Sequence, residues 1–550
     1  MSDPLSMFYK WEQETPGQLL FHQPFPEGAR TYTYAHAGDE IRRMAAALTA
    51  FDLPPRSRIA ILSKNCAHWI MADFAIWMSG HISVPVYPTL SAHGIKQILD
   101  HSEAKAIFVG KLDDYESQRS AIEEHVQKIS FPFYGISDGL LWNELVDRHA
   151  PIETKHPFDR HEMVTIKYTS GTTGVPKGVM ISFHAIDHAL AHAFALMKTG
   201  PTDRFFSYLP LSHIAERMLV ELGAIYNGAT IYFSESLEKF ADNLSHAQPT
   251  VFLAVPRIWA KFREKILDKL PQKLLNTLLA IPVINSLIKR TIRRKLGLTE
   301  CKWAITGASP ISVELLEWYQ KLGITIQEVY GMTENLAWAT SNISEVRFGS
   351  IGKPWSNVEV RIAADGELQT KGDATMLGYY KMPELTKDTF TSDGFLKSGD
   401  VARIDADGFY FITGRIKDQF KTDKGKYIAP LPIEMMLMSN TDIENVCVVG
   451  MGVPQPIALV VLSPAGKAKS KEEIISSMTE LLAMVNKEVE AYERLQAAVI
   501  MKDDWTIANG LLTPSLKIRR NEVEKIHLPV YPHWYGLNQQ VVWEELEVRS

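Results

Sequence analysis

The sequence has few of the features that mark secreted, membrane-spanning or disulfide-stabilised proteins. Its 550 residues include only three cysteines, which lie far apart at Cys66, Cys301 and Cys447. An odd number of isolated cysteines gives neither a disulfide framework nor a zinc pattern, and it predicts a reducing, cytoplasmic environment. The first residues include acidic side chains and no apolar core, unlike a secretory signal. No run of about 18 or more uninterrupted apolar residues is present, so no membrane span is predicted.

An excess of positive charge is missing as well, and so are repeats and low-complexity tracts. The formal net charge of −6 argues against a general affinity for nucleic acid. A hydrophobic content of 46% and a charged content of 22% are ordinary for a globular protein. Because 550 residues are too many for one hydrophobic core, two or more domains are expected.

Patterns typical of strands and helices alternate over residues 30–150. Strands are expected at Arg56–Ser63, Ile82–Tyr87 (weakened by Pro85) and Ala106–Val109, and helices at Trp69–Ser79 and Ile95–Ala104. This alternation predicts an α/β domain with a mostly parallel sheet, whose ligands gather at the carboxyl ends of the strands. Strand patterns at Val446–Gly450 and Ile457–Leu462, followed by a helical pattern at Lys471–Lys487, predict a second, compact α/β unit.

A stretch rich in glycine and hydroxyl side chains, KYTSGTTGVPKGVM at residues 167–180, lies between two apolar runs that predict strands. Glycine exposes backbone N–H groups, and a polyphosphate needs such donors together with positive charge. The order Pro-Lys-Gly differs from the Gly-Lys-Ser/Thr of the NTPase P-loop. A flexible loop is the plain alternative. The candidate phosphate-binding residues are Thr169, Ser170, Gly171, Thr172, Thr173, Gly174 and Lys177.

The run YTSGTTGVPKGV at residues 168–179 resembles the signature of the adenylate-forming superfamily, which includes acyl- and aryl-CoA ligases, luciferases and peptide-synthetase adenylation domains. The resemblance implies a large, multi-layer N-terminal domain with mixed and parallel sheets, here residues 1–416. It also implies a small, mobile α+β C-terminal domain, here residues 417–550. ATP, Mg²⁺ and coenzyme A are the implied cofactor and co-substrates.

Two further segments fit a bound nucleotide. Small residues in WAITGAS would let a flat ring approach the backbone, and Tyr330 in YGMTEN could stack on it. Thr333 offers a hydroxyl to a phosphate, and Glu334 offers a carboxylate to Mg²⁺. The resemblance implies that Glu334 is a metal ligand together with Thr173. It implies an adenine platform made by Gly307, Ala308, Ser309, Tyr330 and Gly331.

Three more residues acquire a role only through the resemblance. Asp400 could accept both hydroxyls of a ribose, and Arg415 could hold oxygens in a fixed fork, although each alone is more simply a surface charge. His213, in SYLPLSHIAERM, would by itself be a structural histidine. The resemblance implies that Asp400 and Arg415 contact ATP and that His213 lines the carboxylate end of an acyl pocket.

The C-terminal region resembles the mobile half of the same superfamily. Lys417 occupies the position of the hinge, and KTDKGKYIAP resembles the loop for the thiol acceptor, with Lys424, Gly425 and Lys426. NGLLTPSLKIRR resembles the loop of the catalytic lysine, here Lys517. Many relatives carry glycine before that lysine, whereas Leu516 stands here, as in long-chain ligases. The implied catalytic set is Lys517, Glu334, Thr333 and His213.

Two other segments admit two interpretations. His184, His188 and His192 are spaced four apart, so a metal site is conceivable, but an ordinary helix face is favoured because no carboxylate or cysteine pattern accompanies them. Residues 273–295 combine an apolar run with a basic flank. They form either a scaffold helix interrupted at Pro282 or an amphipathic segment that lies on an anionic bilayer.

Together the motifs predict an AMP-forming ligase that activates a medium- or long-chain fatty acid as an acyl-adenylate and transfers it to coenzyme A. The predicted location is the cytoplasm, with possible peripheral contact at the inner face of the membrane. Three alternatives stay open: transfer to an acyl-carrier protein, a ligase for an aryl or other carboxylic acid, and an inactive lipid- or nucleotide-binding homologue.

Overall fold

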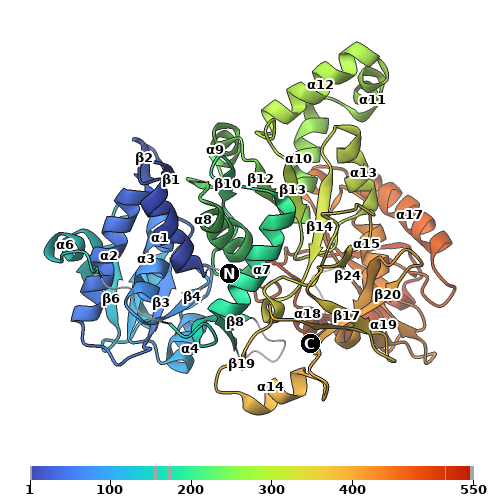
Figure 1. Cartoon of the computed structure of the whole chain (residues 1–550). Coiled ribbons are helices and arrows are strands. Elements are labelled where there is room, and N and C mark those ends of the chain that lie inside the picture. The colour runs from blue at the N-terminus through green and yellow to red at the C-terminus, as the bar shows by residue number, and fades with distance from the viewer. Residues whose placement is uncertain (1–2, 154–157, 170–175, 514–515, 545–550) are drawn as a thin grey trace.

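The computed structural model describes residues 3–153, 158–169, 176–513 and 516–544. They form a large N-terminal domain with two extended sheets and a smaller C-terminal domain that packs beside it (Figure 1). The chain therefore has the predicted α/β fold class.

The first large sheet contains the strands predicted in the N-terminal region. Its central strands are parallel, and β8 and β9 form an antiparallel hairpin. The predicted strand with Pro85 is a full strand inside the sheet, although its recorded pairing with β8 is confined to Ser83 and Thr165. Proline removes one backbone donor, so a short pairing at this point is expected. The strand order is β19 (Gly378–Tyr379), β9 (Lys177–Ser182), β8 (Met163–Thr169), β4 (Ile82–Val86), β3 (Arg58–Leu62), β5 (Ala106–Val109), β6 (Gln127–Ser130) and β7 (Leu140–Leu141).

The second large sheet crosses the middle of the N-terminal domain (Figure 1). Six of its strands, β1 and β10 to β14, pair in parallel, and antiparallel strands lie at both edges. The strand order is β16 (Lys353–Pro354), β15 (Thr340–Ser341), β14 (Ile326–Tyr330), β13 (Trp303–Thr306), β12 (Val251–Leu253), β10 (Arg204–Ser207), β11 (Thr230–Phe233), β1 (Leu19–Phe25) and β2 (Gly28–Thr33).

Apolar helices pack these sheets together. Every residue of α3 (Ala67–Met78) is buried, because the helix is apolar on all sides except at His68 and Asp73. A single core cluster includes residues from both large sheets and from the helices around them. These helices are α1 (Pro4–Glu14), α2 (Tyr34–Ala50), α3 (Ala67–Met78), α6 (Trp142–Arg148), α7 (Phe183–Met197) and α8 (Gly223–Asn227). The helices α4 (Ala92–Ser102) and α5 (Tyr115–Gln118) pack into a second cluster on the first sheet, and α9 (Phe240–Ala247) packs into a third cluster on the second sheet.

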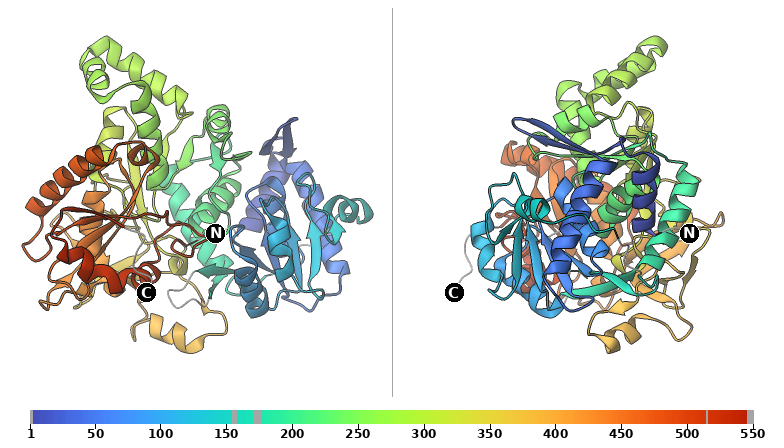
Figure 2. Two further views of the ribbon diagram at one scale, coloured as in Figure 1. Left: turned by 180° about the vertical axis from the view of Figure 1, so that it is seen from behind. Right: turned by 60° about the vertical axis from the view of Figure 1, so that its left-hand side comes forward.

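A helical segment projects from the second sheet. The predicted break at Pro282 is confirmed, because α11 (Gln272–Ala280) ends just before it and α12 (Pro282–Lys295) begins with it. Both helices stand out from the body of the molecule in all views (Figures 1 and 2). They follow α10 (Pro256–Lys269) and precede α13 (Val313–Lys321).

A four-stranded antiparallel sheet joins the two domains. Its strands are β17 (Glu359–Ile362), β18 (Glu367–Lys371), β20 (Leu396–Ile404) and β21 (Tyr410–Arg415), with α14 (Pro383–Thr389) before β20. Antiparallel pairing across Asp365-Gly366 and Asp407-Gly408 follows from the turn preference of Asp-Gly. The short helix Ile416–Asp418 then leads into the C-terminal domain.

The C-terminal domain has a four-stranded sheet that is buried on both faces. Alternate residues of its strands belong to two separate core clusters, one with α15 and α17 and one with α18 and α19. Trp534 and Trp543 of the tail pack into this domain. Its elements are β22 (Phe420–Lys421), β23 (Tyr427–Ile428), α15 (Pro430–Leu437), β24 (Ile443–Val449), β25 (Ile457–Leu462), α16 (Pro464–Lys467), α17 (Lys471–Glu488), β26 (Ala498–Ile500), α18 (Arg520–His527), α19 (Tyr531–Gly536) and β27 (Val541–Trp543).

Candidate active site

Three of the predicted ATP-contacting residues meet where the ends of β14 and β21 lie beside the middle of β20. Tyr330 ends β14, while Asp400 on β20 is paired in register with Arg415 on β21. The Tyr330 hydroxyl donates to Asp400 Oδ2 at 2.6 Å, and Arg415 Nε donates to Asp400 Oδ1 at 2.7 Å. Burial and the adjacent carboxylate raise the pKa of Tyr330, and Asp400 raises the pKa of Arg415. This arrangement fixes both side chains before any ligand arrives.

The backbone around Glu334 is tightly folded. A side chain at Gly331 would meet the backbone of Ala337 at 2.3 Å, so only glycine fits there. Leu336 and Ala337, directly after the turn Thr333–Asn335, have left-handed φ angles of 57° and 59°. The backbone therefore fixes the position of the buried Glu334 carboxylate. Trp338, which follows, is buried and stacked on Trp355 with 3.8 Å between the ring centroids.

Tyr379 connects two predicted site residues and was missed by the sequence reasoning. Its hydroxyl donates to Glu334 Oε1 at 2.7 Å, and Lys177 Nζ lies 5.5 Å from the centre of its ring. Tyr379 lies on β19, which pairs with the β9 strand that Lys177 begins. Glu334 and the exit of the predicted phosphate loop are thus both close to the side chain of Tyr379. Nothing in the run GYYK signals this role.

The predicted phosphate loop itself lies mostly beyond the described part of the chain. Ser170, Gly171, Thr172, Thr173 and Gly174 fall outside the described residues. Thr169 and Lys177 are described and are paired in register, as the last residue of β8 and the first residue of β9. The ends of the loop therefore lie at the predicted edge of the sheet.

The small residues Gly307, Ala308 and Ser309 follow β13 directly. A side chain at Gly307 would approach the Val329 carbonyl to 2.9 Å, and Ala308 has a left-handed φ of 68°. The close approach to β14 places this turn next to the strand that ends in Tyr330. This position is compatible with the predicted platform for a flat ring.

Lys517 extends from the C-terminal domain toward these N-terminal residues. Its ammonium lies within electrostatic range of Arg415, Asp400, Glu334 and His213. Although the side chain keeps accessible surface, protein atoms surround it closely enough for desolvation, followed by Arg415, to lower its pKa. A turn holds the loop, with Lys517 N donating to Thr513 Oγ1 at 3.0 Å. Leu516 has a left-handed φ of 61°, the conformation for which glycine is the usual residue.

His213 lies in the segment between β10 and a π-helix at Glu216–Leu222. Desolvation, with Lys517 and Lys167 as further causes, lowers the pKa of His213 to about 3. The imidazole is therefore neutral at physiological pH. Its Nδ1 accepts a hydrogen bond from the Ala215 backbone N–H at 3.2 Å, which fixes the ring.

A buried group of charged side chains supports β8 and the His213 segment. Lys167 donates to the Leu211 carbonyl at 3.0 Å, which links the strand before the phosphate loop to the residues before His213. Arg217 pairs with Asp73, lies 3.9 Å from Glu221 and donates to Thr165 at 3.2 Å. In the sequence, the only sign of this buried group is that Lys167 interrupts the apolar run at residues 163–169, and no prediction was based on it.

Replacement of Arg217 by methionine should lower the free energy of unfolding by about 3–5 kcal/mol, because it leaves Asp73 buried without its cation. Thermal and urea unfolding would measure the change. Arg148→Met is the matched control, since Arg148 pairs with Glu144 on the surface and should unfold like the wild type. Equal stability of R217M and wild type would contradict a stabilising role for this buried pair.

The hinge and acceptor-loop residues do not join the cluster. Lys417 lies exposed in the connecting helix Ile416–Asp418. Lys424, Gly425 and Lys426 form an exposed turn between β22 and β23, and Lys426 Nζ lies 5.6 Å from the Tyr492 ring of the same domain. This orientation of the domains presents Lys517, not the acceptor loop, to the N-terminal site.

The three histidines that are spaced four residues apart lie outside the cluster around Asp400. His184 and His188 approach Asp373 at 3.8 and 3.6 Å, but within the described residues no group of three or more His, Cys, Asp or Glu side chains could hold a metal ion.

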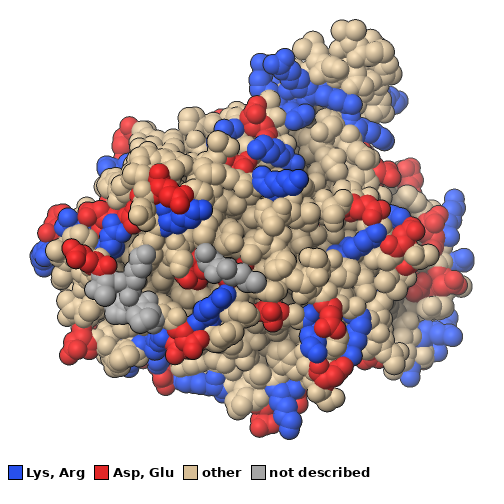
Figure 3. Space-filling view, in the orientation of Figure 1, with Lys and Arg blue, Asp and Glu red and all other residues tan. Residues whose placement is uncertain are grey.

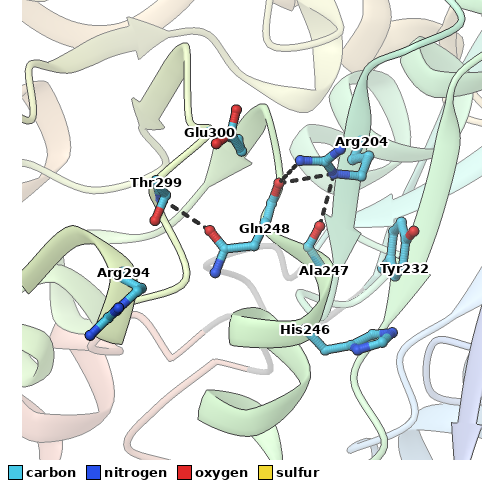
Figure 4. Close-up of a pocket in the computed structure, with 8 residues that line it drawn as sticks. All are labelled: Arg204, Tyr232, His246, Ala247, Gln248, Arg294, Thr299 and Glu300. Carbon is cyan, nitrogen blue, oxygen red and sulfur yellow. Dashed lines mark hydrogen bonds between the residues drawn. The ribbon is translucent and has the colours of Figure 1, made fainter. Parts of the chain in front are cut away.

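A hollow of about 430 Å³ shares no residue with the predicted site (Figure 4). Its Arg204 guanidinium already donates to the carbonyls of Ala247 and Gln248. No helix in the described ranges is long and apolar enough to cross a membrane.

The fold agrees with comparisons to known families. A family model described as AMP-binding enzyme matches residues 8–380, and one described as AMP-binding enzyme C-terminal domain matches residues 417–527. The chain therefore belongs to the AMP-binding enzyme family, the adenylate-forming enzymes. CoA ligases of this family use ATP, Mg²⁺ and coenzyme A.

The individual relatives described next are at most 28% identical in sequence to this chain. A long-chain-fatty-acid–CoA ligase, FadD15 of Mycobacterium bovis, is 28% identical over 94% of both chains. The A domain of a carboxylic acid reductase from Segniliparus rugosus, solved with AMP and a co-purified carboxylic acid, has a TM-score of 0.81 at 20% identity and covers 98% of this chain and 94% of its own. The anthranilate CoA ligase AuaEII, solved with anthranoyl-AMP, has a TM-score of 0.78 at 19% identity and covers 95% and 97%.

Proposed function

We propose that this protein activates a long-chain fatty acid with ATP and transfers the acyl group to the thiol of coenzyme A. The observation that carries the proposal is the approach of Lys517, from the C-terminal domain, to Arg415, Asp400 and Glu334 of the N-terminal domain. The two cations, Lys517 and Arg415, suit the phosphates of a nucleotide. The two carboxylates suit its other parts, because Asp400 can accept the ribose hydroxyls and Glu334 can bind the metal ion.

In the first half-reaction the acid's carboxylate attacks the α-phosphorus of ATP, which forms the acyl-adenylate and releases pyrophosphate. Asp400 accepts the ribose hydroxyls, and Lys177 and the phosphate loop hold the departing phosphates. Lys517 neutralises the negative charge that develops at the reacting centre. Positioning and electrostatics supply most of the catalysis in such a reaction.

The residues near Glu334 fit a magnesium ion that is held mainly by the nucleotide. Mg²⁺ usually takes one or two carboxylates and completes its shell with phosphate oxygens and water. Glu334 is a buried carboxylate with no ion-pair partner in the described residues, and Tyr379 donates to only one of its oxygens. The ion would supply charge neutralisation at the phosphates, and Thr173 is the proposed second contact.

The neutral His213 would lie at the carboxylate end of the acyl pocket. A neutral ring does not form an ion pair with the acid, so it leaves the carboxylate free to attack phosphorus. Thr333, directly before Glu334, would place its hydroxyl on the α-phosphate. Gly307, Ala308, Ser309 and Gly331 would flank the adenine with Tyr330.

In the second half-reaction the thiol attacks the acyl carbon and AMP leaves. We propose that residues 1–416 and 417–550 rotate relative to one another about Lys417, so that Lys517 withdraws and Lys424, Gly425 and Lys426 turn toward the adenylate. Their present exposure on the C-terminal domain is compatible with such an exchange.

The choice of a long-chain fatty acid is supported by the relative named as a long-chain ligase, which matches 94% of this chain. The anthranilate ligase, at 19% identity, supports an aryl acid as the second candidate. Hydrophobic acids of this length partition into bilayers, so we also propose a cytoplasmic enzyme with peripheral membrane contact.

A panel of acids tests this function. With ATP, Mg²⁺ and CoA, pyrophosphate release should be fastest with acids of long acyl chain and about 10²-fold slower with acetate or anthranilate, since each buried methylene contributes to binding. Highest activity with anthranilate or benzoate would replace the fatty acid by an aryl acid.

The same assay decides the acceptor when holo acyl-carrier protein replaces CoA, because only the true acceptor should accelerate AMP release. Absence of AMP formation with every acid would indicate a binding protein without activity.

A further inference from the structure

The helical hairpin Gln272–Lys295, formed by α11 and α12, is a folded part of the N-terminal domain. Leu275 and Ile292 are buried in the core cluster beneath it, together with residues of α10 and α13. The Trp318 indole donates to Gln272 Oε1 at 2.9 Å, and the Asn285 amide donates to the Leu279 carbonyl across the bend. The hairpin thus holds a defined shape while it projects from the molecule (Figure 2).

The outer surface of the hairpin exposes several large apolar side chains. Leu274 is 49% exposed, Ile281 42%, Val283 84% and Leu287 64%. Val283 and Leu287 are four residues apart, so they lie on one face of α12. Apolar side chains gathered at the end of a projecting element indicate a contact surface more strongly than single exposed residues do.

The same hairpin carries an unbalanced positive charge. It contains no acidic residue in a chain whose net charge is −6. Within the described residues no ion pair neutralises its basic side chains. Figure 3 shows blue atoms gathered at one end of the projection and uncharged atoms at the other. The basic residues are Lys273, Lys289, Arg290, Arg293, Arg294 and Lys295.

We propose that the 272–295 hairpin docks this enzyme on an anionic lipid bilayer. An α-helix rises about 1.5 Å per residue, so Arg290 lies about 10 Å along α12 from Val283. Interfacial helices bury their apolar side chains about 5–10 Å into the boundary between headgroups and acyl chains, so groups this far apart can reach the acyl region and the lipid phosphates together. Val283 and Leu287 enter the acyl region while the basic end of α12 meets lipid phosphates. An acidic protein surface would pair with the arginines, but it would offer Val283 and Leu287 no hydrocarbon region to enter.

Vesicle co-sedimentation of the full chain tests the proposal. The probes are phosphatidylcholine vesicles with and without about 30% phosphatidylserine, and no acid, ATP or CoA is added. Binding therefore stands or fails independently of the proposed catalytic function. Wild-type protein should bind the anionic vesicles, and 0.5 M NaCl should weaken that binding because salt screens the contact.

Two double variants separate the two contributions. V283S/L287S should bind anionic vesicles at least about tenfold more weakly, because two buried aliphatic side chains are lost. R290E/R294E should lose about tenfold or more and should abolish the preference for phosphatidylserine. Leu237→Ser is the apolar control, since Leu237 is also 84% exposed. K387E/K487E is the charge control, and both controls should bind like the wild type.

Several results would overturn the proposal. One is failure of the wild type to bind anionic vesicles at low salt, and another is binding by V283S/L287S equal to that of L237S. Light scattering that shows a dimer in the wild type and a monomer in V283S/L287S would assign the surface to a second copy instead. Circular dichroism and thermal unfolding like those of the wild type would confirm that each variant is folded.

Discussion

Replacement of Lys517 by alanine should reduce acyl-adenylate formation by a factor of about 10²–10³, the usual effect of removing one fixed donor from a developing negative charge. Lys517 is the cation that the C-terminal domain brings to Asp400 and Glu334. Its protonated form is the active one, and desolvation followed by the nearby Arg415 lowers its pKa, so adenylate formation should fall as pH rises through that lowered pKa. Pyrophosphate release under saturating acid and ATP measures the rate.

The defect should be confined to the first half-reaction. Chemically prepared acyl-adenylate supplied with CoA should yield thioester at nearly the wild-type rate in K517A, because Lys517 withdraws before the thiol arrives. Lys525→Ala is the matched control, as Lys525 is an exposed lysine on α18 that pairs with Glu522. Unchanged pyrophosphate release by K517A would remove Lys517 from the mechanism.

Replacement of Lys417 by proline should leave ATP–pyrophosphate exchange intact and slow thioester formation by about 10²-fold, because small misplacements of reacting groups cost that much. Proline fixes φ near −65°, which the short helix Ile416–Asp418 already requires, so the present orientation of the domains persists. The same restraint opposes the backbone rotation that would carry Lys517 away. Exchange of labelled pyrophosphate and formation of acyl-CoA measure the two halves separately.

Lys417→Ala is the control for this variant, because it removes the side chain but keeps the backbone free, and it should support both halves. The ion pair between Arg257 on α10 and Glu444 on β24 also connects the two domains in the present orientation. If K417P loses pyrophosphate exchange and thioester formation equally, the proposed alternation of the domains is wrong.

Local pattern was sufficient for much of the fold. The predicted strands Ala106–Val109 and Ile457–Leu462 have the observed bounds, because each is a short apolar run enclosed by polar residues and turns. The break at Pro282 follows from proline's missing N–H. Helix ends were less certain: Ile95–Ala104 was predicted, whereas the helix begins at Ala92 after the Ser91 cap and ends at Ser102, where Glu103 turns left-handed.

The sequence by itself determined which residues carry chemical groups suited to ATP, and its motifs implied the family, because those residue types lie in short, ordered segments. Only the tertiary structure decided that Tyr379 links Lys177 to Glu334, that Lys167 ties β8 to the His213 segment, and that Lys517 rather than Lys424 faces Asp400. These contacts join residues that are tens to hundreds of positions apart. Their distances depend on how sheets and domains pack, and no local pattern encodes that packing.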